Sequence, residues 1–259
     1  AGGGTIVDAT TIGIGRDPTA LARIARATGL NVLLGAGYYV DAVHPDGMDG
    51  KTEAEVAAEI VHDITDGVGD TGVRAGIIGE LGCSWPLTDN EAKVLRAGAH
   101  AQQQTGAAIL IHPGRNESAP FEILAILADA GADVGRVIMG HLDRTIYDED
   151  TLLKLASKGS YLEYDLFGWE TSNYSLSDKD MISDAQRITY IQKLIAAGHT
   201  DQIVVAQDIY SKHRLASYGG HGYHHVIENI VPRMRKRGIS ESNIESIYIK
   251  NPARVLTLA

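Results

Sequence analysis

The sequence has 259 residues, of which 44% are hydrophobic, and its formal net charge is −10 at pH 7. The acidic balance argues against nucleic acid and anionic membrane surfaces as partners, and the single cysteine, Cys83, excludes a disulfide framework and a CxxC metal or redox motif. Because no basic leader and no run of 18 apolar residues is present, we expect no membrane span and a cytoplasmic protein.

The first third of the chain alternates between strand and helix patterns. The apolar run IVDAT precedes an amphipathic segment from Pro18 to Thr28, which Gly29 closes in the position typical of a helix C-terminus. The run NVLLGAGYY then leads into a loop at 41–50 and a helix predicted over about 52–67. Thr52 and Glu55 have the spacing of a capping box at the start of that helix.

The same alternation continues to the C-terminus through five more apolar runs. Thr88 and Glu91 predict a second capping box after the run RAGIIGE. Further helices are expected to end near Ala130, Lys158, Ala197 and Arg237, and a last one in NPARVLTLA. The remaining four runs are GAAILIH, RVIMGH, SYLEYD and QIVVAQD.

Consistent β-α alternation predicts an α/β fold, and specifically a (β/α)8 TIM barrel formed by residues 1–259 as a single domain. A doubly wound open sheet is the competing architecture, but no GxGxxG turn follows any strand. Only seven strands can be counted, and the chain starts almost inside the first. Since an open remnant would leave two long parallel edges unpaired, we expect a barrel lacking its first strand and an N-terminally truncated sequence.

Four of the apolar runs end in residues that suit a metal site. Glu80, His112, His141 and Asp208 close the third, fourth, fifth and seventh strands, and the carboxyl ends of barrel strands form the catalytic face. Imidazole nitrogens and carboxylate oxygens are ligands of zinc and similar divalent ions. Any one of these residues could be structural, but four at corresponding positions favour a metal-dependent hydrolase, with Asp208 also taking the proton from the attacking water.

Other strand-end residues are candidates for the substrate pocket. Tyr38 and Tyr39 could contact substrate, although tyrosines at a barrel mouth often pack with only their hydroxyl in water. Arg115 could bind an anionic group with two parallel hydrogen bonds, or pair with a loop carboxylate. Asp165 is expected to orient neighbouring groups, and Cys83 to be inert.

The segments GELGCSW, ILIHPGR, IMGHLDRT, YLEYDLFG and YGGHGYHH resemble the phosphotriesterase family of the amidohydrolase superfamily, and most strongly its phosphotriesterase-related members. The resemblance runs from GGGTIVDAT to NPARVL. It implies a (β/α)8 barrel with two divalent metal ions, zinc in most members, and a metal-bridging hydroxide. Glu80 would take the place of the bridging residue, which is a carbamylated lysine in the phosphotriesterases proper. His112 and His141 match the ligands of the more exposed metal, and Asp208 matches the aspartate that binds the buried metal and moves the proton.

One feature of the family is missing from the sequence. Its members supply two further histidines to the buried metal from an HxH motif at the end of the first strand, and no HxH occurs in this chain. The missing motif belongs to the strand that the count lacks, which is why truncation is expected. Without it the buried metal would keep only Glu80 and Asp208.

The sequence therefore predicts a zinc-dependent hydrolase acting on a small ester, lactone, amide or phosphoester. An N-acyl amide with an anionic group for Arg115 is favoured. The alternatives are a decayed or non-catalytic barrel that binds a small ligand, and a sugar-phosphate-binding barrel that would use the glycine-rich run 219–222. The resemblance also admits a homodimer, because dimers are common in that family.

Overall fold

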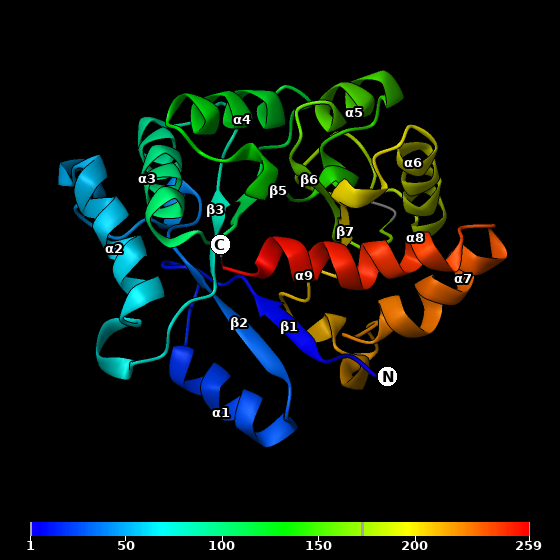
Figure 1. The fold of residues 1–259 in the computed structure, drawn as a ribbon, viewed down its shortest axis with the longest axis horizontal. Helices are drawn as coiled ribbons and strands as arrows, with labels where there is room; N and C mark the ends of the chain where they lie inside the picture. Colours follow the sequence, from blue (N-terminus) through cyan, green and yellow to red (C-terminus); the bar gives the residue numbers. More distant parts are fainter. Residues whose placement is uncertain (1, 172–173, 259) are drawn as a thin grey trace. The chain divides into compact units, whose positions relative to one another are not determined.

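A computed structural model of the chain describes residues 2–171 and 174–258. Its seven strands are ordered β1 to β7 in the sheet, which is also their order along the sequence (Figure 1). A doubly wound sheet reverses its strand order at a switch point, whereas a (β/α) barrel adds each strand beside the last. The predicted barrel fold with seven strands is therefore confirmed among the described residues. Contacts divide the chain into an N-terminal unit, Gly4–Met139, and a C-terminal unit, Gly140–Arg254. The last residues of the chain belong to the N-terminal unit, and the first residues belong to the C-terminal unit.

In the N-terminal unit, five parallel strands alternate with four helices. Each strand pairs with the next one along the chain, from β1 with β2 to β4 with β5. The elements are β1 (Thr5–Asp8), α1 (Pro18–Thr28), β2 (Asn31–Ala36), α2 (Glu53–Thr65), β3 (Ile77–Gly82), α3 (Asp89–Thr105), β4 (Ile109–His112), α4 (Ala119–Asp129) and β5 (Val137–Met139).

The C-terminal unit contains the last two strands, which also pair in parallel. Its elements are α5 (Glu149–Ala156), β6 (Tyr161–Tyr164), α6 (Asp184–Ala196), β7 (Ile203–Val205), α7 (Val231–Lys236) and α8 (Glu241–Glu245). Two π-helical turns, Val226–Ile230 and Ser246–Lys250, precede α7 and α9, and α9 (Asn251–Leu256) is the last helix.

The local signals at the helix ends explain why these segments are helical. Helix α1 begins at Pro18 and ends before Gly29, whose φ of 73° is the left-handed conformation that glycine adopts freely. Both predicted capping boxes form, since the hydroxyls of Thr52 and Thr88 each accept a hydrogen bond from the backbone N–H three residues on. Each box satisfies backbone N–H groups that have no partner inside the helix.

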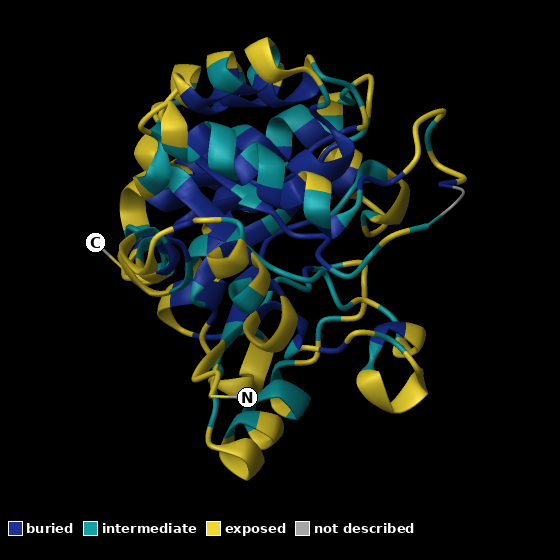
Figure 2. Cartoon of the chain, turned by 90° about the vertical axis from the view of Figure 1, so that its right-hand side faces the viewer, coloured by how far each residue is buried: buried dark blue, intermediate teal, exposed yellow. Residues whose placement is uncertain are grey.

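The inner strands of the N-terminal unit are buried, and buried residues, dark blue in Figure 2, fill the interior of the fold. Ile77, Ile78 and Ile109 have no exposed surface, and all four residues of β4 are buried. Strand β1, at the end of the sheet, is different: its residues are exposed or half-buried in alternation. Parallel strands covered on both faces are apolar at every position, so β3 to β5 form the core and β1 does not.

Glu91 on α3 connects the loops that follow β2 and β3. Its carboxylate accepts hydrogen bonds from the backbone N–H of Asp41 and from the N–H and hydroxyl of Ser84, at 2.8–3.0 Å. It also accepts the capping-box bond from the N–H of Thr88. The side chain has no exposed surface, and these donors replace the hydrogen bonds to water that the carboxylate loses on burial.

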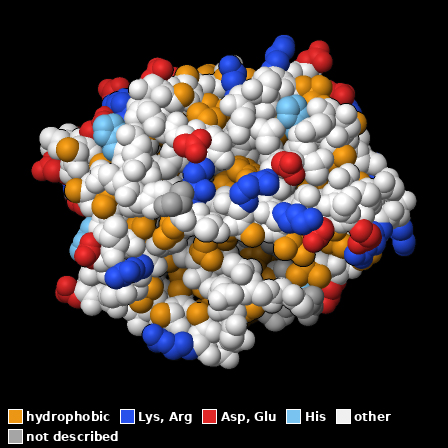
Figure 3. Space-filling model, in the orientation of Figure 1, with side chains coloured by type: hydrophobic (Ala, Val, Ile, Leu, Met, Phe, Trp, Pro, Cys, Tyr) orange, Lys and Arg blue, Asp and Glu red, His pale blue; other side chains and the backbone are white. Residues whose placement is uncertain are grey.

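Charged side chains of both signs are interspersed on the face shown in Figure 3. That face carries no large basic patch of the kind that nucleic-acid-binding proteins use. Among the described residues, no helix combines the length and apolar character that a membrane span needs.

Candidate metal centre

Three of the predicted ligands come from consecutive strands. Glu80 lies within β3, His112 is the last residue of β4, and His141 follows β5 by two residues. Parallel pairing of β3 with β4 and of β4 with β5 brings their carboxyl ends to the same edge of the sheet. His141 belongs to the C-terminal unit by contacts, but its short connection to Met139 attaches it to the end of β5.

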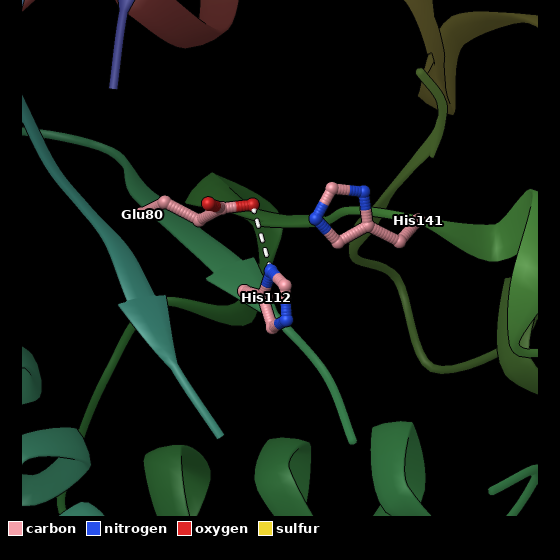
Figure 4. Close-up of side chains that lie close together, drawn as sticks. All are labelled: Glu80, His112 and His141. Carbon is pink, nitrogen blue, oxygen red and sulfur yellow. Dashed lines mark hydrogen bonds and ion pairs between the residues drawn. The ribbon is translucent and has the colours of Figure 1, made fainter. Parts of the chain in front are cut away.

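Within residues 2–171 and 174–258, one group of three or more His, Cys, Asp and Glu side chains brings its ligand atoms within 4.8 Å of one another. The group consists of Glu80, His112 and His141, whose side chains converge in Figure 4. The sequence prediction of a carboxylate–histidine–histidine set is thus matched by geometry.

The backbone before Glu80 requires glycine. Gly79 has a φ of 106°, and a Cβ added there would lie 2.2 Å from the carbonyl oxygen of Leu110 on the neighbouring strand. Neither the conformation nor the contact tolerates a side chain. The sequence Gly79-Glu80 therefore lets β3 lie close against β4 where it presents the carboxylate.

His112 is held between a phenol and a carboxylate. Its Nδ1 lies 2.9 Å from the hydroxyl of Tyr39 and 3.3 Å from Oε1 of Glu80. The Tyr39 ring meets the imidazole edge to face, with ring centroids 4.7 Å apart. Since the side chain of His112 is 9% exposed and that of Glu80 18%, both are largely shielded but still reachable from solvent.

His141 adopts an unusual backbone conformation and has a dedicated carboxylate partner. Its φ of 53° lies in the left-handed region, which costs a non-glycine residue energy. Asp165, directly after β6, accepts a hydrogen bond from the His141 backbone N–H at 2.8 Å and lies 2.8 Å from the ring Nδ1. When Nδ1 donates to this carboxylate, the neutral imidazole carries its lone pair on Nε2.

The donor set fits a divalent metal ion. Two imidazoles and one carboxylate are the combination that zinc and similar ions take from proteins. A carboxylate that fixes the tautomer of a ligand histidine is the usual outer partner in such sites, and Asp165 has that position. The expectation that Asp165 orients a neighbouring group agrees with its contacts to His141.

Asp208 lies in the C-terminal unit, three residues after β7, and is half-buried. Its φ is 45°, and among the described residues only His141 and Asp208 combine a side chain with a positive φ. Strained backbone concentrates at functional sites, where the rest of the fold maintains it. The backbone therefore singles out two of the four residues that the sequence predicted as ligands.

The predicted pocket residues differ in their surroundings. Tyr38 is only 2% exposed, and its hydroxyl donates to Glu59 and accepts from Lys51 at 3.2 Å. Burial, followed by the hydrogen bond to Glu59, raises the pKa of Tyr38 to about 12. Tyr38 is therefore a packing residue in this structure, which argues against the predicted substrate contact, whereas Tyr39 lies beside His112. Arg115 is exposed in the loop after β4.

Cys83 was expected to be inert. Its side chain is 1% exposed, and burial raises the pKa of the thiol well above its ordinary value. A thiol that stays protonated is a poor nucleophile and a poor metal ligand. The environment of Cys83 therefore agrees with the expectation.

A buried ionic network in the C-terminal unit was not predicted from the sequence. Arg187, which has no exposed surface, donates from Nε to Asp143 and from Nη1 to Asp184 at 2.8 Å. The other oxygen of Asp184 lies 2.8 Å from Nε2 of His225, and Asp143 accepts from the backbone N–H of Asp165. Only the i,i+3 spacing of Asp184 and Arg187 on α6 was visible in the sequence as a signal. Through Asp143, this network supports the segment that holds Asp165 against His141.

Comparison with known proteins gives consistent matches over nearly the whole chain. The sequence model of the phosphotriesterase family matches residues 1–256. An N-acetyltaurine hydrolase of Salmo salar is 50% identical over 258 residues, which cover 99% of this chain and 74% of that protein.

Solved structures agree with the sequence matches. A resiniferatoxin-binding protein from Rhodobacter sphaeroides has a TM-score of 0.94 and 34% identity, with 98% of this chain and 71% of that chain covered. A phosphotriesterase homology protein from Escherichia coli, solved with phosphate in its active site, has a TM-score of 0.87 and 29% identity, with coverage of 98% and 84%. Likeness at this level over 98% of the chain extends the barrel assignment to both units.

Proposed function

This chain belongs to the phosphotriesterase family and is a metal-dependent hydrolase, and from that premise we propose that it cleaves the amide bond of a small, anionic N-acyl compound. The observation that carries the proposal is the convergence of Glu80, His112 and His141 at the ends of three consecutive strands. The substrate class is supported by the 50% identity to a protein named N-acetyltaurine hydrolase.

We propose that Glu80, His112 and His141 hold a divalent ion, with zinc the metal that best suits their donor atoms. A second ion would add Asp208 to Glu80, which is the ligand pair that this chain offers for it. A bound divalent ion supplies Lewis acidity, which polarises the scissile carbonyl and lowers the pKa of water. Because Glu80 is a carboxylate by nature, it needs no covalent modification to serve as a ligand.

The other roles are assigned to groups of the chain itself. Asp208 would accept the proton of the attacking water and pass it to the leaving amine nitrogen. Asp165 would keep the Nδ1 proton of His141 in place, and its distances of 2.8 Å to the backbone nitrogen and to the ring Nδ1 of His141 support this role. Tyr39 would keep His112 in register and reach toward the acyl group, while Arg115 would meet the anionic group from the loop after β4.

The test measures metal content and hydrolysis together. Purified protein would be analysed for zinc and other divalent ions, and acetate release from N-acetyltaurine would be followed before and after chelation. We expect bound metal, hydrolysis that chelation abolishes and added zinc restores, and loss of both metal and activity in Glu80→Ala and His141→Ala. Asp208→Asn should lose hydrolysis while retaining the ion held by the other three residues.

The controls decide between this proposal and a non-catalytic barrel. Asp129→Asn, on the outer surface of α4, should behave as the wild type in both measurements. Metal binding without hydrolysis of any N-acyl amide would favour a barrel that only binds a small ligand. Absence of metal from the wild type would contradict the proposed ligand set. The number of ions per chain would show whether Asp208 and Glu80 retain the second site.

Three further expectations belong to the same proposal. We propose that residues 1–259 act as one catalytic domain, that the protein is cytoplasmic, and that it is compatible with a homodimer. The single cysteine supports the compartment, since the chain has no disulfide that would require an oxidising one. Size-exclusion chromatography with light scattering and fractionation of tagged protein would test the last two.

A further inference from the structure

Arg214 is a buried cation in the loop that follows β7. The residue is 7% exposed and lies six positions after Asp208, on a short helical turn spanning Lys212–Arg214. Arginine is almost never buried without a partner, because removing its charge from water is costly. The groups around this guanidinium therefore indicate which kind of partner it binds.

Two aromatic rings hold the guanidinium. Its central carbon lies 4.8 Å from the centroid of Trp169 and 5.7 Å from that of Tyr210. The two rings also pack on each other, with centroids 5.6 Å apart. Tyr210 is 61% exposed, so it forms the solvent-facing side of this pair of rings. Aromatic faces stabilise and orient a guanidinium but do not neutralise it.

One terminal nitrogen of the Arg214 guanidinium has a hydrogen-bond acceptor among the described residues and the other has none. Nη2 donates to the backbone carbonyl of Gln207 at 2.7 Å, and Gln207 directly precedes Asp208 in the sequence. Nη1 is buried and has no hydrogen-bond acceptor among the described residues. A buried arginine donor without an acceptor is rare in folded proteins.

The electrostatic surroundings point to an incoming anion. Burial lowers the pKa of Arg214, which means that the guanidinium charge is incompletely compensated, although Asp208, Tyr210 and Asp165 act in the opposite direction. Asp208 and Asp165 have other tasks in the proposed site. An anionic ligand group would supply both the missing charge and the missing acceptor for Nη1.

We propose that Arg214 is the specificity-determining residue of the site, binding the sulfonate or carboxylate of an anionic N-acyl substrate through Nη1 inside the Trp169–Tyr210 bracket. The inference rests on the proposed function, and it adds Arg214 to Arg115 as a residue for anion recognition. Arg214 is held by the carbonyl of Gln207 and by the rings of Trp169 and Tyr210. A pre-positioned donor loses less side-chain entropy on binding.

The experiment compares two substrates of similar shape that differ in charge. N-acetyltaurine carries a sulfonate, and its methyl sulfone analogue, N-acetyl-2-(methylsulfonyl)ethylamine, is neutral and similar in shape. For each enzyme the measured quantity is the ratio of kcat/KM for the two substrates, so that a general loss of folded or active protein cancels. The wild type should prefer the anion. Arg214→Gln should lower the ratio by roughly 10- to 100-fold, as expected for removing a charged hydrogen bond.

Further variants separate anion recognition from packing. Arg214→Lys keeps the charge but loses the planar fork, and it should retain part of the preference. Arg233→Gln, at an exposed arginine that has no assigned role, should leave the ratio at the wild-type value. Binding of taurine by calorimetry gives a second readout that needs no turnover, and Arg214→Gln should weaken it.

Two results would overturn the proposal. An unchanged ratio in Arg214→Gln would show that the anion is bound elsewhere. An equal loss of kcat/KM on both substrates would assign Arg214 a structural role in holding the Gln207–Asp208 turn. Failure of the wild type to hydrolyse either amide would contradict the proposed function instead, and taurine binding by the wild type and by Arg214→Gln would then still decide the role of Arg214.

Discussion

Asp165 makes two contacts with the same residue, His141: its carboxylate accepts the backbone N–H at 2.8 Å and lies 2.8 Å from the ring Nδ1. The pair links ring orientation to backbone conformation, because one carboxylate contacts both the ring and the backbone of His141, whose φ is 53°. A side chain with one contact could rotate about it, whereas two contacts fix the ring. The imidazole is thereby aimed before any ligand arrives.

Asp165→Asn should weaken metal binding without unfolding the protein. Asparagine can still accept the backbone N–H, but it no longer provides a carboxylate for Nδ1, so the tautomer is no longer enforced. Loss of such an outer partner typically costs about 10- to 100-fold in metal affinity. Zinc affinity would be measured by competition with a chromogenic chelator, with Asp129→Asn as the control. Wild-type affinity in Asp165→Asn would contradict the role assigned to this contact.

The two adjacent tyrosines should respond differently to loss of the hydroxyl. Tyr39→Phe removes the group 2.9 Å from Nδ1 of His112 and should lower kcat/KM or metal affinity with little change in melting temperature. Tyr38→Phe removes the contacts to Glu59 and Lys51 and should lower stability by about 1 kcal/mol, as for an ordinary hydrogen bond, while leaving kcat/KM unchanged. Thermal unfolding and steady-state kinetics on both variants would check this. The reverse pattern would exchange their roles.

Gly79→Ala should be far more damaging than Gly159→Ala. Both glycines have positive φ, 106° and 93°, but an added Cβ at Gly159 meets nothing within 4 Å, whereas at Gly79 it would lie 2.2 Å from the Leu110 carbonyl. Backbone strain alone should cost Gly159→Ala about 1–2 kcal/mol. Gly79→Ala should exceed that value and also reduce metal content, because the displaced strand carries Glu80. The free energy of unfolding of the two variants would be measured in urea. Equal losses of stability would show that the contact with the Leu110 carbonyl is relieved in Gly79→Ala.

The acid stability of the protein should depend on Asp184. Burial by itself raises the pKa of this carboxyl, but hydrogen bonds from His225 and the Gly168 N–H, with the charge of Arg187, outweigh it and hold the pKa below its ordinary value. The resulting stabilisation is present above the unfolded-state pKa of about 3.9 and is lost as the pH falls through the folded-state value. Asp184→Asn should therefore be less stable than wild type at pH 7, by about 3–5 kcal/mol for a broken buried pair.

The pH dependence of stability shows whether the pKa of Asp184 is lowered or raised by folding. As the pH falls from about 4 through the lower folded-state pKa, the stability of the wild type should approach that of Asp184→Asn, because the carboxyl then becomes protonated in the folded state as well. Chemical denaturation at a series of pH values would measure the difference. A gap that widens toward low pH would mean that the pKa of Asp184 is raised rather than lowered.

Much of the fold could be predicted because its signals are local. Pro18 and Gly29 mark the ends of α1, and Thr52 and Thr88 with their glutamates mark the starts of α2 and α3, since caps satisfy groups within a single turn. The convergence of Glu80, His112 and His141 could be predicted for a different reason. In a parallel barrel every strand ends at the same face, so strand-terminal residues converge whatever their separation in the chain.

The contacts between distant side chains could not be predicted in this way. Arg187 and Asp143 are 44 positions apart, and nothing in their local sequence shows that both are buried and paired. The burial of Arg214 depends likewise on rings from two different loops. The Tyr38–Tyr39 pair is an intermediate case. The sequence named both as possible substrate contacts, and adjacent residues leaving a strand point to opposite sides, so that only one of the two lies beside His112.

The fixed position of Glu91 limits how such a site can diversify. Because its buried carboxylate joins the loops after β2 and β3 to the start of α3, a change in either loop strains the other and the helix cap together. Substitutions that adapt the site to a new substrate should cost less stability in segments that are not hydrogen-bonded to a residue shared with other loops. The stretch between β6 and α6, which contributes Trp169, and the Tyr210–Arg214 turn are the places where related enzymes are expected to differ most in length and composition.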